Sequence, residues 1–524
     1  MPGTTAPARI PPRAAAVLTA LVLTAAICNL TLAGATVALP QIATDFNASQ
    51  TTLNLIALGT GLGMAMTVLY AGAIADRYGR VRVLCIGLIA LLVTGTAAAL
   101  APSAETLMAA RVLTGMAAGM AFPTTLALIT ALWTDGAARG RAIALWTAIC
   151  AGATVGGSIL SGALVDTVGW RIALGAPVPL ALVALVLAAR TVPRGVEESS
   201  EPVDHLGGVV SVVAVAALVL GVEVVFAPGE ASTGGLLLLA AAALLAVFFA
   251  RQRAAASPLY DLQVARRRLF WVPAVAGALA FGALEGAMFV GQQYLQNILG
   301  YDAMQSGLAL LPAAAALLLC GAPASILVSR GVRPSMTLGY VLLAGAFAAM
   351  LAWTADTPSW LVALAFALVG GGASFVMTAA SRSLMSSTPV RRAGMASATT
   401  DLQTDLGGAI LQALLGAVLA GGFARVFGDL ISSSPEGTTI GADVARALRA
   451  SYASALHVAS DNPAYADRII EAARISFVDG AWAAYLVGGI AIALGFLVVL
   501  LGLPSPTEER RLRERYARED APVA

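Results

Sequence analysis

The nine residues from Gly72 to Arg80 read Gly-Ala-Ile-Ala-Asp-Arg-Tyr-Gly-Arg, and they separate two long apolar stretches of the chain. Glycine allows a tight backbone turn, and Asp76 can pair with Arg77 or Arg80 or with the end of a neighbouring helix. The chain around this stretch is 59% hydrophobic and only 11% charged. We therefore interpret Gly72–Arg80 as a short polar connection between two membrane helices.

The composition sets the class of protein independently of any motif. A mean hydropathy of +0.84 over 524 residues excludes a soluble globular protein, whose surface needs far more charge. The net formal charge of +2 gives no reason to expect a nucleic-acid partner. All four cysteines fall inside apolar stretches and predict neither a disulfide framework nor a metal site: Cys28, Cys85, Cys150 and Cys320.

Apolar windows of about 20 residues, the length that crosses a bilayer, occur about fourteen times. They begin near Ala14, Thr51, Val83, Thr106, Ala142, Ile172, Leu206, Gly234, Phe270, Met304, Ser335, Ser359, Gly394 and Ala481. Because the first window is too long for a cleaved signal peptide, we expect it to be retained as a helix. The sequence thus predicts an all-α membrane protein with about 14 transmembrane helices.

The arginines predict the orientation of these helices, because positive charge is enriched in cytoplasmic loops. Arginines occupy alternate connections, and the segment that follows residue 507 is also rich in them. We therefore expect a multi-pass protein of the cell membrane, with both termini cytoplasmic. The alternate connections contain Arg77, Arg80 and Arg82; Arg139 and Arg141; Arg251, Arg253, Arg266, Arg267 and Arg268; Arg330 and Arg333; and Arg391 and Arg392.

The helices group into blocks along the chain. We expect an N-terminal six-helix bundle over 1–193, a two-helix insert over 194–268, a C-terminal six-helix bundle over 269–504 and a cytoplasmic tail over 505–524. In the second bundle, the stretch Leu327–Arg333 follows the second span, as Gly72–Arg80 does in the first. We interpret it as a degenerate repeat of that stretch and as an indication of two related halves.

One long polar segment, 429–479, lies between the last two spans on the external side. Apolar residues recur at helical spacing in Ala442–Leu448 and in Tyr465–Glu471. We expect a helical hairpin or cap over the outer mouth. Such a segment can gate release or contact a partner, or it can be a packed lid.

The stretch Gly72–Arg80 resembles the G-x-L-A-D-R-x-G-R loop between the second and third helices of major facilitator superfamily transporters. Over nearly the whole chain, the order and spacing of further motifs are similar to the fourteen-helix multidrug/proton antiporter branch of that superfamily, the QacA/EmrB type. These motifs are Ala38–Ile42, Arg111–Gly115, Trp170–Arg171 with Pro179, Tyr294–Gln296 with Gly300, Ser306–Gly307, Leu311–Pro312, Gly394–Ala398 and Leu406–Ala409.

The resemblance implies the major facilitator fold, with two six-helix bundles plus two additional helices. It also implies a proton-coupled exporter of small hydrophobic or amphipathic, often cationic, compounds that works by rocker-switch alternating access. It implies no cofactor. Within the first motif, a role at the cytoplasmic gate is implied for Gly72, Asp76, Arg77, Gly79 and Arg80.

Three acidic residues are the candidates for proton coupling and substrate binding. Glu285 lies near the centre of the ninth span, where exposure to lipid would cost at least a few kcal/mol, so it should face the bundle interior. Asp401 and Asp405 lie one turn apart on one helix face, roughly 10 to 17 Å from the cytoplasmic start of their span. Two carboxylates that close cannot both ionise cheaply in a low dielectric, so we expect them to share a proton. The alternatives are a structural hydrogen bond for Glu285 and ordinary solvated acids for the pair.

Polar residues of the first half supply further candidates. The family places a proton-handling arginine at the position of Arg111, although an arginine there can equally serve packing by capping neighbouring helix ends. Further polar candidates for the cavity wall are Asn29, Thr31, Gln292 and Gln296.

The sequence departs from the family pattern mainly in the first half. Thr31 stands where such antiporters commonly have an aspartate, and Thr114 replaces a glutamine. In the fifth helix, Gly157–Leu164 lacks the proline and one glycine of the family motif, although Gly157 and Gly162, with Gly152 and Gly156, still permit close helix packing. These changes move the predicted coupling chemistry to the C-terminal half.

Other functions stay open from the sequence. The exported compound could be an endogenous metabolite or lipid, and a non-transporting sensor or scaffold could reuse the fold. An enzyme is not expected, since there is no nucleophile elbow, phosphate loop or metal-ligand cluster, and the two histidines, His205 and His457, lie far apart. We expect a monomer whose partners are a small-molecule substrate, protons and the lipid bilayer.

Overall fold

The computed structural model describes residues 11, 13–133, 136–194, 202–227, 229–255, 258–389, 393–434 and 440–520. Two arginines used for the predicted orientation, Arg391 and Arg392, lie outside these ranges, as do parts of the predicted segments 194–268, 429–479 and 505–524. Within the described ranges every regular element is a helix, and fourteen helices are long and apolar enough to cross a membrane. The predicted fold class and span count are therefore confirmed.

The first six spans form what we call the N-terminal bundle, and the next two form the insert. The bundle consists of α1 (Ala14–Phe46), α2 (Gln50–Tyr78), α3 (Arg80–Ala99), α4 (Ala104–Leu132), α5 (Gly136–Val168), α6 (Trp170–Gly175) and α7 (Pro177–Thr191). Here α6 and α7 together make one span. The insert consists of α8 (His205–Val225) and α9 (Ala231–Ala254).

The remaining six spans form what we call the C-terminal bundle. It follows the short α10 (Leu262–Ala265) and contains α11 (Arg268–Asn297), a span broken into α12 (Ala303–Leu308), α13 (Leu311–Leu319) and α14 (Gly321–Arg330), then α15 (Val332–Leu351), α16 (Ser359–Ser386), α17 (Ala393–Ser433) and α20 (Ala466–Gly502). Outside the spans lie α18 (Ala442–Ala450), α19 (Tyr452–Asp461), η2 (Pro463–Tyr465) and α21 (Pro506–Glu519).

Two tight connections each contain a glycine with a positive φ. Gly79 joins α2 to α3 with φ 105°, and Gly331 joins α14 to α15 with φ 149°. A residue with a Cβ is strained in this region, so glycine is required at both positions. The shared positive φ supports the interpretation of Leu327–Arg333 as a repeat of the first motif.

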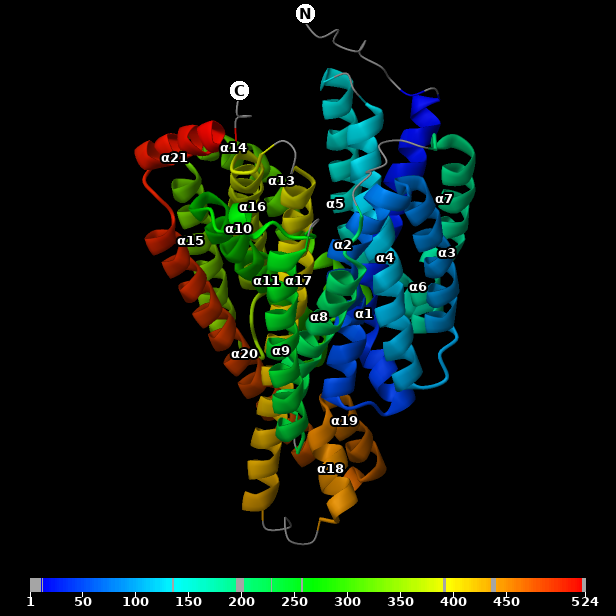
Figure 1. The fold of residues 1–524 in the computed structure, drawn as a ribbon. Coiled ribbons are helices and arrows are strands. Elements are labelled where there is room, and N and C mark those ends of the chain that lie inside the picture. Colours follow the sequence, from blue (N-terminus) through cyan, green and yellow to red (C-terminus); the bar gives the residue numbers. More distant parts are fainter. Residues whose placement is uncertain are drawn as a thin grey trace, which may run out of the picture.

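The molecule has two distinct ends (Figure 1). The start of α1 and the whole of α21 lie at one end, which we call the terminal face. The helices α18 and α19 lie at the opposite end, which we call the hairpin face. The two bundles approach each other toward the hairpin face and diverge toward the terminal face.

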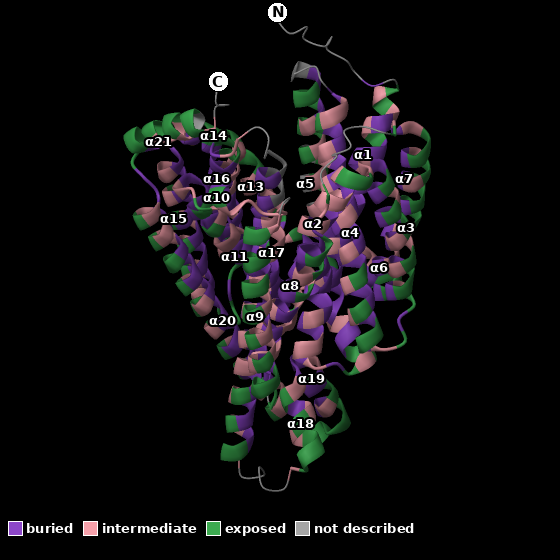
Figure 2. Ribbon diagram, in the orientation of Figure 1, coloured by how far each residue is buried: buried purple, intermediate pink, exposed green. Residues whose placement is uncertain are grey.

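The apolar core has the same asymmetry. Buried residues from the hairpin half of the N-terminal bundle, such as Ala35, Ile42 and Leu107, share one continuous cluster with the C-terminal bundle. Residues from its terminal half, such as Leu21 and Leu88, form a separate cluster. Figure 2 shows that buried residues lie inside both bundles and that exposed residues lie on the outer helix surfaces. The two halves are therefore packed together at the hairpin face.

Small residues allow this close approach. A Cβ at Gly162 of α5 would lie 2.8 Å from the Cα of Met304, and one at Gly307 would lie 2.9 Å from the carbonyl oxygen of Ser158. The glycine of the fifth-helix motif therefore packs across the boundary between the bundles. By contrast, a Cβ at Gly152 or Gly156 would meet nothing within 4 Å, so the expectation of close packing at these two residues is wrong.

The external segment differs in part from the sequence prediction. The first patterned stretch does form a short helix, α18, and α19 completes a hairpin that the sequence pattern did not delimit. The second patterned stretch, Tyr465–Glu471, is mostly the start of α20, so the last apolar window, which begins near Ala481, continues a helix that starts at Ala466. The hairpin touches the N-terminal bundle, because the Ser451 hydroxyl donates to the Ala48 carbonyl at 3.2 Å.

The insert contacts both bundles. α8 packs against α9, α2 and α17. Its residues Val215 and Val219 share an apolar cluster with Leu62 of α2 and Ala413 of α17. At the other end of α8, the His205 ring forms hydrogen bonds of 2.8 and 3.2 Å with two tyrosine hydroxyls of α2. The insert is thus an integral part of the interface between the two halves.

Candidate functional site

A close crossing of α11 and α17 brings the acidic candidates together. A Cβ at Gly282 of α11 would overlap the carbonyl group of Gly407, and a Cβ at Gly407 would overlap the backbone of Ala278. Glycine on both helices therefore allows the two backbones to approach more closely than ordinary side chains permit. The crossing places the middle of α11 against the segment of α17 that contains the two aspartates.

Glu285 lies at this crossing. Its Cγ would be 3.3 Å from a Cβ built on Gly408, so the side chain runs along α17 one turn beyond Asp405. Glu285 is partly buried and faces the other helix, as the sequence predicted. No structural hydrogen bond from its carboxylate is seen in the described part of the chain, which leaves it available to a ligand.

Asp401 and Asp405 have the arrangement expected from their spacing. Both are partly exposed within the bundle, and the Thr404 hydroxyl donates to the Asp401 carbonyl at 2.7 Å. Asp405 lies within electrostatic range of both Asp401 and Glu285. Three acidic groups from two helices thus form one cluster, which we call the carboxylate cluster.

Arg111 occupies a different place, deep in the N-terminal bundle. Its side chain is 2% exposed and donates to the Thr31 carbonyl at 2.9 Å and, more weakly, to the Ile56 carbonyl at 3.5 Å. Its second terminal nitrogen, Nη2, has no hydrogen-bond partner among the described residues. Arg111 therefore contacts Thr31, the position where the resemblance implies an aspartate, and Thr31 offers it only a backbone oxygen.

The four polar cavity candidates have different surroundings. Thr31 donates to Ile27 of its own helix at 2.8 Å, and Asn29 accepts from Thr154 of α5 at 3.1 Å. Gln296 donates to Ser306 at 3.2 Å, so it joins α11 to α12 near the hairpin face. Gln292 is 2% exposed, and its amide nitrogen has no partner within the described ranges.

The motif of the first connection forms a local ion pair at the terminal face. Arg80 binds Asp76 with an N to O distance of 2.7 Å and donates to the Ala127 carbonyl of α4 at 3.3 Å. The predicted pairing of these charges with each other and with a neighbouring helix is therefore confirmed. These contacts tie α2, α3 and α4 together inside one bundle.

One acid that is buried inside a membrane span escaped the sequence reasoning. Glu223 of α8 is 1% exposed and accepts from the Asn54 amide at 2.9 Å. One signal could have revealed it, because Glu223 is an acid inside the apolar window that begins near Leu206.

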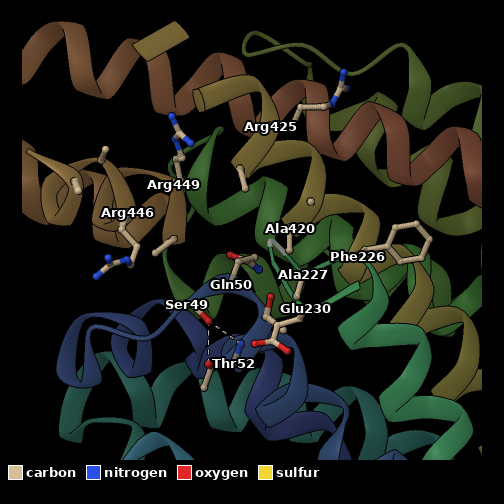
Figure 3. Close-up of a pocket in the computed structure, with 16 residues that line it drawn as sticks. Ser49, Gln50, Thr52, Phe226, Ala227, Glu230, Ala420, Arg425, Arg446 and Arg449 are labelled. Carbon is tan, nitrogen blue, oxygen red and sulfur yellow. Dashed lines mark hydrogen bonds between the residues drawn. The ribbon is translucent and has the colours of Figure 1, made fainter. Parts of the chain in front are cut away.

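A pocket of about 940 Å³ opens near Glu223 at the hairpin face, where the insert meets both bundles. Figure 3 shows Gln50, Phe226 and Glu230 in its wall, with Ser49 and Thr52 joined by hydrogen bonds at the start of α2. Arg446 and Arg449 of α18 also line it. The pocket is separate from the carboxylate cluster.

Comparison with known proteins gives a consistent picture. A family model described as Major Facilitator Superfamily matches residues 21–412. The chain is 30% identical over 484 residues to the multidrug efflux pump LfrA of Mycolicibacterium smegmatis, across 91% of this chain and 94% of that protein. It is also 30% identical over 492 residues to the tetracenomycin C resistance and export protein of Streptomyces glaucescens, across 91% and 89%.

Solved structures agree with the fold. A bacterial homolog of the human lysosomal transporter Spinster, in an inward-facing and occupied conformation, superimposes with a TM-score of 0.66. The match covers 99% of this chain and 100% of that one at 14% sequence identity. At this identity the likeness concerns the fold alone, and it confirms the predicted arrangement of helices.

Proposed function

Because the chain belongs to the Major Facilitator Superfamily, a family of transporters and not of enzymes, we propose that it is a proton-coupled exporter of small hydrophobic or amphipathic compounds, often cationic. The observation that carries the proposal is the carboxylate cluster of Glu285, Asp401 and Asp405 at the α11–α17 crossing. The names of the relatives, an efflux pump and an export protein, support export as the direction of transport.

The carboxylate cluster is suited to exchange a cation for protons. A carboxylate inside a membrane protein is costly when charged and without a partner, so it binds either a proton or another cation. Among the described residues no arginine forms an ion pair with these three groups. A cationic substrate can therefore displace a proton from the cluster, and a proton can displace the substrate.

The rocker-switch step uses the asymmetric packing of the bundles. We assign the terminal face to the cytoplasm, in agreement with the arginine-rich connections that end there. The continuous core and the α5–α12 contact then close the outer side. In this arrangement the substrate enters from the cytoplasm, and tilting of the bundles exposes the cluster to the outer side.

The N-terminal bundle has a supporting role in this scheme. Arg111 is fixed by the carbonyls of Thr31 and Ile56 and has no acidic partner there. Thr31 replaces the first-helix acid of related antiporters, so the guanidinium of Arg111 remains as a fixed positive charge in this half. Proton exchange then takes place in the C-terminal half.

A second candidate is export of an endogenous metabolite. Its support is the similarity to the tetracenomycin C resistance and export protein, which extends over 91% of this chain. The two candidates share the mechanism and differ only in the compound carried.

Flux measurements in proteoliposomes test the proposal. We expect a pH gradient, acidic on the outer side of the protein, to drive tetraphenylphosphonium against its concentration gradient. Asp401→Asn and Asp405→Asn should each abolish uphill transport, and Glu285→Gln should change its pH dependence. Wild-type protein that moves no tetraphenylphosphonium or other lipophilic probe under the gradient would support a sensor or scaffold instead, and unchanged transport in both aspartate variants would refute the assigned site.

A further inference from the structure

Glu223 is a buried carboxylate that the exchange mechanism does not use. It lies two residues before the end of α8, in the insert, and 1% of its surface is exposed. Its Oε1 accepts from the Asn54 amide at 2.9 Å, and its Oε2 has no partner among the described residues. A carboxylate with a single neutral donor is poorly stabilised as an anion in such surroundings.

The hydrogen bonds around Glu223 join all three parts of the protein. The Gln50 amide donates to Asn54 at 3.0 Å within α2, and it also donates to Gln293 of α11 at 2.6 Å. Glu223 therefore connects through Asn54 and Gln50 to the C-terminal bundle. Because Gln50 and Gln293 belong to different bundles, this network can persist only while the hairpin face is closed.

The network borders the pocket at the hairpin face. Gln50 lines that pocket, as do Phe226 and Ala227, which follow Glu223 by about one turn (Figure 3). When the two bundles separate at this end, the Gln50–Gln293 bond breaks and water from the pocket reaches Glu223. The carboxylate is then hydrated and can ionise without penalty.

We propose that Glu223 is a proton-binding site of the outer gate, which holds the hairpin face closed when protonated and allows it to open when ionised. The inference rests on the proposed function, because it assigns a gate to the same transport cycle. The proton on Glu223 exchanges only with the outer side, so it regulates opening and is not carried across the membrane. The carboxylate cluster, in contrast, carries the protons that are exchanged for substrate.

Few other titratable groups lie near this gate. On α9 the only described ones, Arg251 and Arg253, lie at the terminal end, as do Tyr70, Asp76, Arg77 and Tyr78 of α2. On α17, Asp401 and Asp405 lie in the terminal half, and Arg425 and Asp429 lie toward the hairpin face. The charged groups that line the pocket are Arg425 of α17, Glu230 at the start of α9, and Arg446 and Arg449 of α18.

The test measures opening of the hairpin face directly. Spin labels on Thr167→Cys of α5 and Met304→Cys of α12 would report the distance across the bundle contact, in the full-length protein in nanodiscs with the four native cysteines replaced. Both positions are exposed, and Met304 adjoins the Asp166 carboxylate across this boundary. We expect the wild-type population to shift from short to long distances as the pH is raised.

Two variants test whether Glu223, and not another titratable group, causes the pH-dependent opening. Glu223→Gln keeps the shape of the protonated acid, so the distance should stay short at every pH. Asn54→Ala removes one hydrogen bond from the closed network, so the closed state is weakened and the midpoint of the shift should move down by about one pH unit, the size expected for one hydrogen bond. The second variant decides the question if Glu223→Gln does not fold.

Glu230→Gln is the matched control, because it removes an acid from the wall of the same pocket and should leave the pH response unchanged. A Glu223→Gln response that follows wild type, or wild-type distances that ignore pH, would overturn the inference. If the wild-type protein transported no substrate but kept its pH-dependent distances, that result would count against the proposed exporter. It would leave the assignment of the gate intact.

Discussion

Neutralising Asp405 should weaken the binding of cations and leave neutral compounds almost unaffected. Asp405 lies within electrostatic range of Asp401 and Glu285, and none of these groups has an arginine partner among the described residues. A monovalent cation about 4 Å from one carboxylate gains about 4 kcal/mol at an effective dielectric constant of about 20. Because Asp405 is partly exposed, we expect about half of this gain, which corresponds to a roughly 10- to 100-fold increase in Kd for Asp405→Asn.

The assay compares a charged probe with a neutral one of similar size. Tetraphenylphosphonium and triphenylphosphine oxide would be titrated into purified protein by isothermal titration calorimetry. Asp429→Asn is the control, because Asp429 is an exposed acid on the same helix and should leave both affinities unchanged. An equal loss of affinity for both probes, or no loss for the cation, would refute the electrostatic role of Asp405.

Three further predictions concern packing and charge. Gly407→Ala should lower the free energy of unfolding by about 2 kcal/mol, because the added Cβ would overlap Ala278. Gly235→Ala is the control, because its Cβ would enter open space and should leave the free energy of unfolding unchanged. Chemical denaturation would measure both values. Arg111→Met should reduce proton-driven flux without abolishing it, because proton exchange takes place in the C-terminal half. Its Tm should change by only a few degrees, because the buried cation has no acidic partner; a collapse of Tm would instead indicate a packing role. Asp520→Asn should cost about 1 kcal/mol in thermal unfolding by breaking a two-bond pair with Arg267. The Asp520 carboxylate raises the pKa of Arg267 above its usual range. The stabilisation from this ion pair is therefore fully present at pH values below that range, and it should stay constant from about pH 7 to 10.

The helices were largely predictable because each span is a continuous apolar segment of the necessary length. The ion pair of Asp76 with Arg80 and the shared face of Asp401 and Asp405 depend only on residues four positions apart. Such local relations follow from helix geometry alone. The sequence therefore predicted these features correctly without knowledge of the tertiary structure.

Features that depend on distant partners could not be predicted in this way. The helix of the last span begins at Ala466, before the apolar window, because a polar helix continues into the apolar one without a break, and hydropathy marks only the apolar part. The hydrogen bond between Glu223 and Asn54 could not be predicted, because the two residues lie 169 positions apart and in different parts of the fold. The roles of Gly162 and Gly407 likewise require the identity of the helix packed against each of them.

Proton release on substrate binding tests the central claim most directly. Tetraphenylphosphonium would be added to protein in weakly buffered detergent solution with a pH-indicator dye, for wild type and for the Glu285→Gln, Asp401→Asn, Asp405→Asn triple variant. We predict that wild-type protein releases protons as the cation binds and that the triple variant releases none. Equal release from both proteins would contradict the assignment of proton exchange to these three carboxylates.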